Sequence, residues 1–481
     1  MEAPDARCVP PTPARFDRCC DGSCVDGVVD TITRGDHMTN TITSAVRIAD
    51  RVRDSIVAAK STATARDCSS SGVAIGSEPE RPIRLLVFTS LYPNSEQPRH
   101  GIFVEERLRK LIETGRVSAT VVAPVPWFPF RSRRFGAYAA FARVPAREER
   151  HGIQILHPRY PVIPKVGMNA AAALMHRAVL PVVRQLFATG AFDLIDAHYL
   201  YPDGVVAARL GQLLGLPVVA TARGNDVTLI PLSVGPRRRI LEAVARMSAV
   251  ITVSAALRTH LIELGAAGDK IHVLRNGVDL QRFRPVDGYA VREKHGLDGT
   301  VWLAVGHLIE RKGVHFVVEA LARCENATLV VAGDGPEERA LHGLAQRLGV
   351  ADRVRFIGAV PHDDLPAYYS AADALFLASS REGMPNVVLE SIACGTPVVA
   401  APFAGVEELV HAPEAGEVAE RRTADAMAAA WQRLAARGVD RSATRRFAEG
   451  FGWTPVVNAQ CRLYGKVLAT RGHVTAQEAA P

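Results

Sequence analysis

The segment SSREGMPNVVLESIACG (residues 379–395) places Glu382 before a Gly-Met-Pro loop and Glu390 about one turn into the helix that we expect to begin near Asn386. The first N–H groups of a helix lack intrahelical partners and carry partial positive charge, so this helix start can bind a diphosphate. A carboxylate at Glu382 can reach a sugar beside the phosphates, and one at Glu390 can accept two hydrogen bonds from ribose hydroxyls. The simpler interpretation is that Glu382 caps the loop and Glu390 is solvated.

The elements that must hold this loop are short apolar runs that alternate with helical patterns along most of the chain. This alternation predicts parallel sheets covered by helices, and the rhythm restarts after a Pro- and Gly-containing stretch at 279–288. We therefore expect an α/β fold of two doubly wound, Rossmann-like domains facing each other across a cleft, with ligands at the carboxyl ends of the strands. The expected strands are 83–89, 117–123, 194–197, 218–221, 250–253, 271–274, 301–305, 329–332, 354–357, 374–377 and 398–401.

The chain of 481 residues is long enough for two such domains with additional ends. Residues 1–80 are rich in Pro, Ser, Thr, Asp and Arg, which predicts a disordered extension with one short helix at 43–60; a wrongly assigned start explains this segment equally well. After it we expect an acceptor-side domain over 81–284, a donor domain over 285–450, a helix over 451–470 that packs back toward the N-terminal domain, and a disordered tail over 471–481. Asp203 is expected to cap the helix that follows it.

The two-glutamate segment, EGMPNVVLE followed by CGTPVVA, resembles the signature of the family 4 glycosyltransferases, which are retaining enzymes of the GT-B fold. The resemblance covers roughly residues 82–468. It implies the transfer of a hexose from a nucleotide-sugar donor (EC 2.4). The other segments that carry it are DAHYLYPDG (196–204), ATARGNDV (220–227), VLRNGVDLQRFRP (273–285), GHLIERKG (306–313) and VVAGDGP (330–336).

The resemblance also implies roles for individual residues of the donor site. Lys312, with Arg311 beside it, would neutralise the donor diphosphate and stabilise the leaving group. Glu382 would contact the donor sugar and Glu390 the ribose, and the loop at 358–361 would contact the base. The residues expected to cradle the phosphates and the sugar are Gly383, Met384, Asn386 and Val387.

Two positions depart from the family pattern. His307 stands where relatives commonly have a basic residue, usually arginine, and Arg223 stands where many relatives have a histidine. His198, at the end of another predicted strand, is the candidate for a catalytic role near the reacting sugar. The remaining candidates on the acceptor side of the cleft are Arg223, Asp226 and Gly101, although Asp226 is equally suited to cap the segment that follows it.

For a retaining GT-B enzyme the resemblance implies front-face displacement, in which the leaving diphosphate accepts the proton of the acceptor. Catalysis then depends on stabilising charge on the diphosphate and on the sugar. No metal or other cofactor is expected, because a helix start and Lys312 can hold the phosphates. The Asp363–Asp364 pair is interpreted as a helix cap. The implied partners are a nucleotide-diphosphate sugar and a glycan or lipid-linked acceptor, in the biosynthesis of cell-surface polysaccharide or glycolipid.

The formal net charge of +7 is spread too widely to indicate a nucleic-acid partner. A segment at 124–141 mixes aromatic residues with Arg131, Arg133 and Arg134, which suits peripheral contact with an anionic membrane; a packed surface loop is the alternative. Arg237–Arg239 form a second basic cluster. We find no signal peptide, no long apolar run and no disulfide framework among the eight cysteines, so the expected location is the cytoplasm or the inner face of the plasma membrane.

Two other functions remain compatible with this fold. A sugar-nucleotide 2-epimerase shares the two-domain shape but would not be expected to carry the Glu382–Glu390 loop. A catalytically inactive binding or scaffold protein is compatible with the departures at His307 and Arg223, whereas the presence of both glutamates and Lys312 argues against it. A dehydrogenase is excluded, because no predicted strand is followed by Gly-x-Gly-x-x-Gly.

Overall fold

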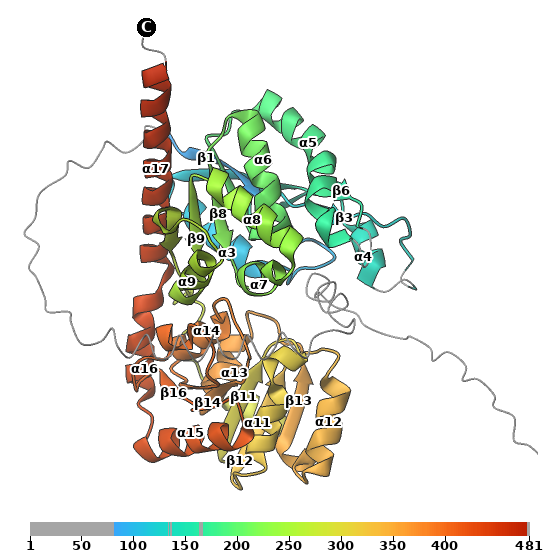
Figure 1. Cartoon of the computed structure of the whole chain (residues 1–481). Coiled ribbons are helices and arrows are strands. Elements are labelled where there is room, and N and C mark those ends of the chain that lie inside the picture. Colours follow the sequence, from blue (N-terminus) through green and yellow to red (C-terminus); the bar gives the residue numbers. More distant parts are fainter. Residues whose placement is uncertain (1–80, 133, 135–136, 163–166, 479–481) are drawn as a thin grey trace, which may run out of the picture.

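The computed structural model describes residues 81–132, 134, 137–162 and 167–478, with side chains as far as residue 470. The expected extension at 1–80, with its helix at 43–60, lies outside the described residues, as does Arg133. The described chain forms two units, each a sheet between layers of helices, and one long helix runs beside both of them (Figure 1).

The N-terminal unit is built on an eight-stranded sheet of order β10-β9-β8-β7-β1-β2-β5-β4, parallel except for the β4–β5 pair. The β4–β5 hairpin is not among the expected strands. The sequence REER of β4 is charged and only half-buried, so it lacks an apolar pattern. The strands are β1 (Ile83–Phe88), β2 (Val117–Val122), β4 (Arg147–Arg150), β5 (Ile153–Leu156), β7 (Leu194–His198), β8 (Val218–Ala222), β9 (Ala249–Thr252) and β10 (Ile271–Val273), with a small separate pair β3 (Val125–Pro126) and β6 (Arg159–Tyr160).

The second unit holds a six-stranded, fully parallel sheet of order β13-β12-β11-β14-β15-β16. The edge strand β16 was not expected, because its sequence, GEV, combines a glycine and a glutamate and forms no apolar run. The strands are β11 (Thr300–Val305), β12 (Ala327–Ala332), β13 (Val354–Gly358), β14 (Ala374–Leu377), β15 (Val398–Ala400) and β16 (Gly416–Val418).

Helices cover the sheets of both units (Figure 1). Those of the N-terminal unit are α3 (Ile102–Ile112), α4 (Ala137–Arg143), α5 (Ala171–Thr189), α6 (Val205–Leu214), α7 (Asn225–Thr228), α8 (Val234–Arg246) and α9 (Ala255–Glu263). Those of the second unit are α10 (Tyr289–His295), α11 (Val314–Leu321), α12 (Glu338–Arg347), α13 (Leu365–Ala371), α14 (Asn386–Ala393), α15 (Ala424–Arg437) and α16 (Arg441–Ala448).

The order of the strands determines where a ligand can bind. In the second sheet the chain starts at β11, continues through β12 and β13 on one side, and then crosses to β14 on the other. Loops that leave adjacent strands in opposite directions open a crevice between β11 and β14. The N-terminal sheet has the same kind of switch between β1 and β7. Four of the segments that carry the family resemblance lie at the ends of β11, β14, β7 and β8.

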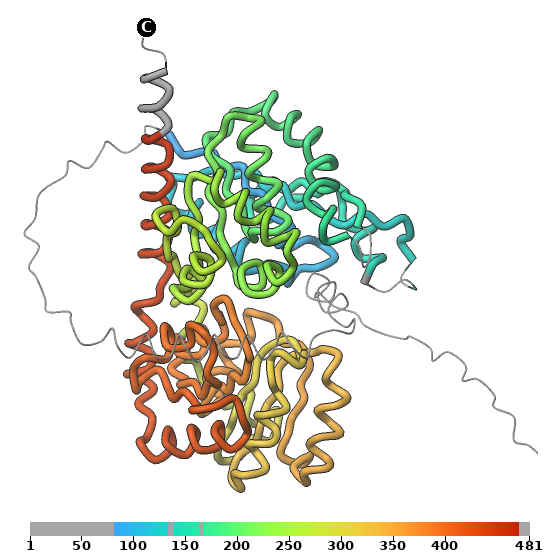
Figure 2. Tube along the Cα trace, in the orientation of Figure 1, coloured from blue at the N-terminus to red at the C-terminus, as the bar shows by residue number. Residues whose placement is uncertain are grey.

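The last helix, α17 (Trp453–Glu478), returns from the second unit to the first, as the trace in Figure 2 shows. Its side chains Trp453, Val457, Cys461 and Tyr464 join the core that also contains Leu108 of α3, so apolar burial fixes the helix on the N-terminal unit. The described backbone is helical as far as Glu478, so the helix extends beyond residue 470, where it was expected to end.

Asp203 does not cap α6, contrary to expectation. The residue at the N-cap position is Gly204, with no side-chain cap, while Asp203 lies buried in the preceding turn, Leu200–Gly204. Its Oδ2 accepts hydrogen bonds from the backbone N–H (2.7 Å) and the hydroxyl (2.9 Å) of Ser90. The carboxyl group thus ties the loop after β1 to the segment after β7.

This burial predicts an unusual pH dependence of stability. Burial raises the pKa of Asp203 to about 7 from an ordinary value of 3.8. Between these values the folded protein keeps a proton that the unfolded chain has lost, so the contribution to the unfolding free energy falls as the pH rises, by at most about 1.4 kcal/mol per pH unit. In Asp203→Asn, which keeps an acceptor for Ser90, this loss is absent. Urea unfolding between pH 4 and 7 should show that the unfolding free energy of the variant rises relative to that of wild type as the pH increases. A constant difference between the two proteins over this range would contradict the raised pKa of Asp203.

Candidate active site

The loop after β14 and the start of α14 form the centre of the predicted donor site. Among the described residues, no side chain caps α14, whose N-cap residue is Pro385. The helix start therefore keeps backbone N–H groups that can bind an anion. Binding of the donor phosphates by Asn386 and Val387 stays a prediction.

Lys312 and Glu382, predicted from separate segments, meet in the crevice between β11 and β14. The ammonium nitrogen of Lys312 lies 2.7 Å from Oε1 of Glu382, and Arg311 Nη1 lies 3.4 Å from Oε2. Burial would raise the pKa of Glu382, but the charges of Lys312 and Arg311 outweigh it and hold that pKa below its usual value. Gly313, at φ +66°, permits this approach, because a Cβ there would lie 2.2 Å from the carbonyl oxygen of Ala378.

Glu390 is buried on α14 with both oxygens in use. The Tyr369 hydroxyl of α13 donates to Oε2 over 2.8 Å, and Nε2 of His362 lies 3.3 Å from Oε1. Nδ1 of His362 faces Arg282 at 3.0 Å, so a ring protonated at Nε2 satisfies both neighbours. His362 and Tyr369 were missed by the sequence analysis; the only signal for His362 is its place directly after the loop expected to contact the base.

The Asp363–Asp364 pair does not act as predicted. Asp364 occupies the N-cap position of α13, but its side chain makes no capping hydrogen bond, and Asp363 pairs with Arg282 at 3.3 Å. The ion pair between Asp363 and Arg282 therefore helps to position the segment that carries His362.

On the N-terminal side, His198 lies buried beneath Arg223. Its Nδ1 is 2.8 Å from Nη2 of Arg223, and its Nε2 is 3.3 Å from Oδ2 of Asp196. Burial lowers the pKa of His198, which keeps the ring neutral. The departure from the family pattern thus has a structural consequence: the side chain that stands over the histidine is an arginine, stacked on the ring of Phe103 at 5.1 Å.

Asp226 and Gly101 do not present side chains to the cleft. The carboxylate of Asp226 is buried and accepts hydrogen bonds from the backbone N–H groups of Leu200 (2.8 Å), Arg223 (3.0 Å) and Gly224 (2.8 Å), so it shapes its own loop. Gly101 has φ +68° at the start of α3, where a Cβ would lie 2.4 Å from the carbonyl of Leu91. Both residues contribute to the backbone geometry of their loops, and their contact with an acceptor stays a prediction.

His307, the other departure, faces the same small space as Lys312. A narrow cavity beneath the loop after β11 is lined by Gly306, His307 and Lys312 among others, and Nδ1 of His307 lies 3.5 Å from Oδ1 of Asp334. The position thus keeps a nitrogen-bearing side chain next to Lys312.

The two halves of the site touch at a pair of glycines. A Cβ on Gly383 would lie 1.8 Å from the carbonyl oxygen of Arg223, and one on Gly224 would lie 3.1 Å from Cα of Gly383. The loop after β8 and the loop after β14 therefore meet backbone to backbone, so that Arg223 and Glu382 belong to one site.

This contact makes Gly383→Ala a specific test of domain closure. The backbone at Gly383 does not need a positive φ, so alanine fits within its own loop but collides with the loop of Arg223 when the domains meet. We expect kcat to fall by on the order of 10–100-fold, the scale for a small misplacement of a reacting group, with a larger radius of gyration in small-angle scattering. Unchanged kcat and radius would show that the contact is dispensable. Gly450→Ala is the control, because an added Cβ there would meet no atom within 4 Å and the backbone needs no positive φ.

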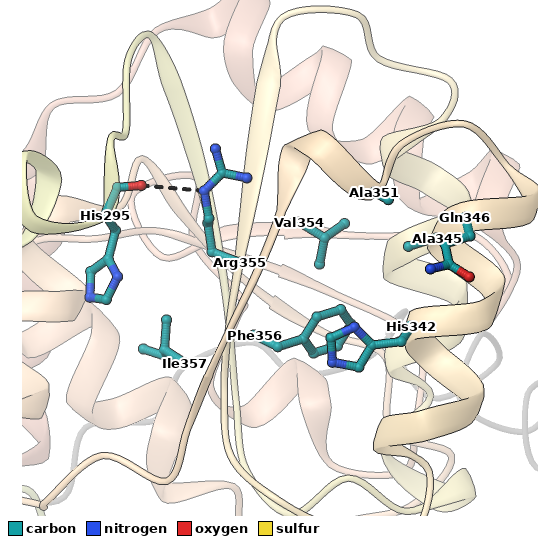
Figure 3. Close-up of a pocket in the computed structure, with 9 residues that line it drawn as sticks. All are labelled: His295, His342, Ala345, Gln346, Ala351, Val354, Arg355, Phe356 and Ile357. Atoms are coloured by element: carbon teal, nitrogen blue, oxygen red, sulfur yellow. Dashed lines mark hydrogen bonds between the residues drawn. The ribbon is translucent and has the colours of Figure 1, made fainter.

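A wider pocket of about 330 Å³ lies elsewhere, at the outer edge of the second unit (Figure 3). It follows the edge strand β13, and Nε of Arg355 donates to the carbonyl of His295 over 3.3 Å. None of the predicted site residues lines it. The lining residues are His295, His342, Ala345, Gln346, Ala351, Val354, Arg355, Phe356 and Ile357.

Two Rossmann-like units, with Lys312 and Glu382 paired beside the start of α14 in the second, form the two-domain arrangement expected of a GT-B glycosyltransferase. The model described as "Glycosyl transferases group 1" matches residues 290–449, and "Glycosyltransferase Family 4" matches residues 172–282. TuaC of Bacillus subtilis, provisionally named a teichuronic acid biosynthesis glycosyltransferase, is 31% identical over 68% of this chain and 83% of its own length. A D-inositol 3-phosphate glycosyltransferase of Frankia alni is 35% identical over 58% of this chain and 75% of its own length.

Solved structures share the fold. The sucrose-phosphate synthase of Thermosynechococcus elongatus superimposes with a TM-score of 0.68 at 22% identity, over 81% of this chain and 100% of that chain. HepE of Anabaena, solved with UDP, superimposes with a TM-score of 0.62 at 23% identity, over 80% of this chain and 100% of that chain.

The chain belongs to the family 4 glycosyltransferases, retaining enzymes that use nucleotide-sugar donors. Membership in this family excludes the alternative function of a sugar-nucleotide 2-epimerase. Within the described residues, no helix is long and apolar enough to cross a membrane.

Proposed function

We propose that this enzyme transfers a hexose from a UDP-sugar to a glycan or lipid-linked acceptor in the biosynthesis of a cell-surface polysaccharide. The observation that carries the proposal is the pairing of Lys312 with Glu382 in the loop that leads into the start of α14, the helix that carries Glu390. The choice of nucleotide is supported by HepE, solved with UDP and with UDP-glucose, and the choice of acceptor by the name of TuaC.

In the proposed reaction the acceptor hydroxyl attacks the anomeric carbon from the same face of the sugar as the departing diphosphate. The bond from that carbon to the diphosphate breaks, and the hydroxyl proton passes to the departing phosphate oxygen. Lys312 exchanges part of its contact with Glu382 for the phosphate, where it stabilises the developing charge together with the N–H groups of α14. Glu382, held ionised, faces the positive charge that develops on the sugar, and Glu390 binds the ribose.

No metal is required in this scheme. The charge that a divalent cation would offset on the diphosphate is met by Lys312, by Arg311 beside it and by the dipole of α14. We expect transfer to continue in the presence of EDTA.

The direct test is the release of nucleoside diphosphate from UDP-, GDP- and ADP-glucose, with extracted lipid-linked saccharides as acceptors. We expect UDP to be released and a labelled lipid to appear, with the anomeric configuration retained. Preference for GDP- or ADP-glucose would contradict the donor assignment. Labelling of water-soluble glycans alone would select the glycan acceptor over the lipid-linked one, and labelling of neither would contradict the acceptor class.

Contact with an anionic membrane is the second part of the proposal. Three aromatic side chains on one segment of the N-terminal unit are more than half exposed: Trp127 (56%), Phe130 (52%) and Tyr138 (51%). Arg131 and Arg134 lie between them in the sequence. Aromatic rings favour the headgroup region and arginines favour anionic lipid, so this aromatic–arginine segment suits a lipid surface that presents the acceptor.

We expect the double variant Trp127→Ser/Phe130→Ser to bind vesicles of phosphatidylglycerol and phosphatidylcholine about tenfold more weakly than wild type, because two apolar side chains no longer leave water. Co-sedimentation measures the partition, and raising the salt concentration should weaken binding of the wild type. Tyr289→Ser, at a residue 66% exposed on α10, is the matched control. Equal partition of both variants and wild type would contradict membrane docking by this segment.

A further inference from the structure

Asn276, in the segment that joins the two units, is buried and bonded to both of them. Its Oδ1 lies 3.0 Å from Nη1 of Arg223 and 3.5 Å from Nη1 of Arg107, both on the N-terminal unit. Its Nδ2 lies 2.9 Å from Oδ1 of Asn386, the first residue of α14. Its backbone N–H points to Sδ of Met384 at 3.2 Å. Only 5% of the residue is exposed, so these contacts replace water.

Arg223 sets the direction of each hydrogen bond in the series that runs from His198 through Asn276 to Asn386. A guanidinium can only donate, so the oxygen of Asn276 must face it and the amide NH2 must face Asn386. Asn386 then has to accept with its oxygen, which turns its own NH2 group away from Asn276. At the other end, Nδ1 of His198 accepts from Arg223, so the ring proton lies on Nε2, toward Asp196.

The NH2 group of Asn386 makes no hydrogen bond to any residue within the part of the chain that the structure describes. It sits on the first residue of α14, where backbone N–H groups are also free to bind an anion. An amide that shows its donor side there adds to the anion site, whereas one that shows its oxygen would repel a phosphate.

We propose that Asn276 is a positioning residue that fixes the amide of Asn386 with its NH2 group toward the donor diphosphate. Through Arg223, the same side chain locks His198 in its Nε2-protonated form. This inference rests on the proposed donor site at α14. Arg223, a half-buried arginine at a position where the family pattern has a histidine, thus sets the direction of the hydrogen bonds that lead to the phosphates.

Asn276→Asp tests the polarity. The aspartate still accepts from Arg223 and Arg107, but it can only accept from Asn386, so that amide must rotate and turn its oxygen toward the phosphates. We expect the UDP dissociation constant, measured by calorimetry, to rise on the order of tenfold, with the uridine dissociation constant nearly unchanged. Asn458→Asp is the matched control, because Asn458 also accepts from an arginine, Arg116, away from the cleft.

A double-mutant cycle separates the amide from the added charge. In an Asn386→Ala background no amide can rotate, so Asn276→Asp should have no further effect on UDP affinity. The same loss in both backgrounds, equal losses for UDP and uridine, or a loss no larger than that of Asn458→Asp would each overturn the inference. Failure of wild-type protein to bind UDP would instead refute the proposed donor. Thermal midpoints confirm that the variants are folded.

Discussion

Replacing Lys312 by alanine is expected to lower kcat/KM for sugar transfer by about 10²–10³-fold, the loss found when one preorganised charge-stabilising group is removed. The lysine lies at 2.7 Å from Glu382 in the crevice where the diphosphate is proposed to bind. Charge on that diphosphate grows as the bond to the sugar breaks, so the lysine contributes more to the transition state than to the bound donor, and kcat should fall more than KM rises.

Two further variants separate this effect from a loss of folding. Lys294→Ala removes an exposed lysine from the same unit and should leave kcat unchanged. In Lys312→Ala the buried Glu382 loses its nearest cation, so its pKa should rise and the protein should be less stable at neutral pH. Adding Glu382→Gln should restore stability but not activity. If kcat/KM of Lys312→Ala lies within about threefold of wild type, the lysine has no role in the mechanism. That result would favour the alternative of a catalytically inactive scaffold protein.

The second large effect is expected at Glu390. In Glu390→Gln one oxygen becomes an NH2 group, so at most one of the two ribose hydroxyls keeps an acceptor, while the Tyr369 hydroxyl can still donate to the remaining oxygen. Losing a charge-assisted hydrogen bond predicts a 10- to 100-fold rise in KM for the donor. Since the ribose is remote from the reacting bond and bound equally throughout, kcat should change much less.

The pattern of kinetic constants is the test at this position. Steady-state assays with UDP-glucose should show the change in KM, and Glu325→Gln, on an exposed turn of the same unit, is the control. A large fall in kcat with unchanged KM would contradict a ribose contact and would place Glu390 near the chemistry instead.

The parts of the fold that could be predicted are those whose signal is local. Strands such as β14 and β15 are buried on both faces, so their apolar runs are continuous in the sequence. Lys312 and Glu382 meet because they follow adjacent strands at the switch point, which the order of the elements already indicates. The β4 strand carries no such pattern and was missed.

The remaining site geometry depends on long-range contacts that no local pattern contains. Tyr369 reaches Glu390 only because α13 packs on α14, and Arg223 covers His198 because the loop after β8 lies over the end of β7. Asp226 follows a strand, as a cleft residue would, yet three backbone N–H groups of its surroundings converge on it. Whether a polar side chain at a strand end serves the ligand or its own loop is decided by its neighbours in space.

The central claim is that a nucleoside diphosphate binds with its phosphates at Lys312 and the start of α14 and with its ribose at Glu390. Calorimetric titration of UDP and of uridine tests it most directly, with wild type, Lys312→Ala and Glu390→Gln. We predict that wild type binds UDP far more tightly than uridine, that Lys312→Ala weakens UDP alone, and that Glu390→Gln weakens both. Equal affinity of wild type for UDP and uridine, or equal losses of the two ligands in Lys312→Ala, would contradict the account.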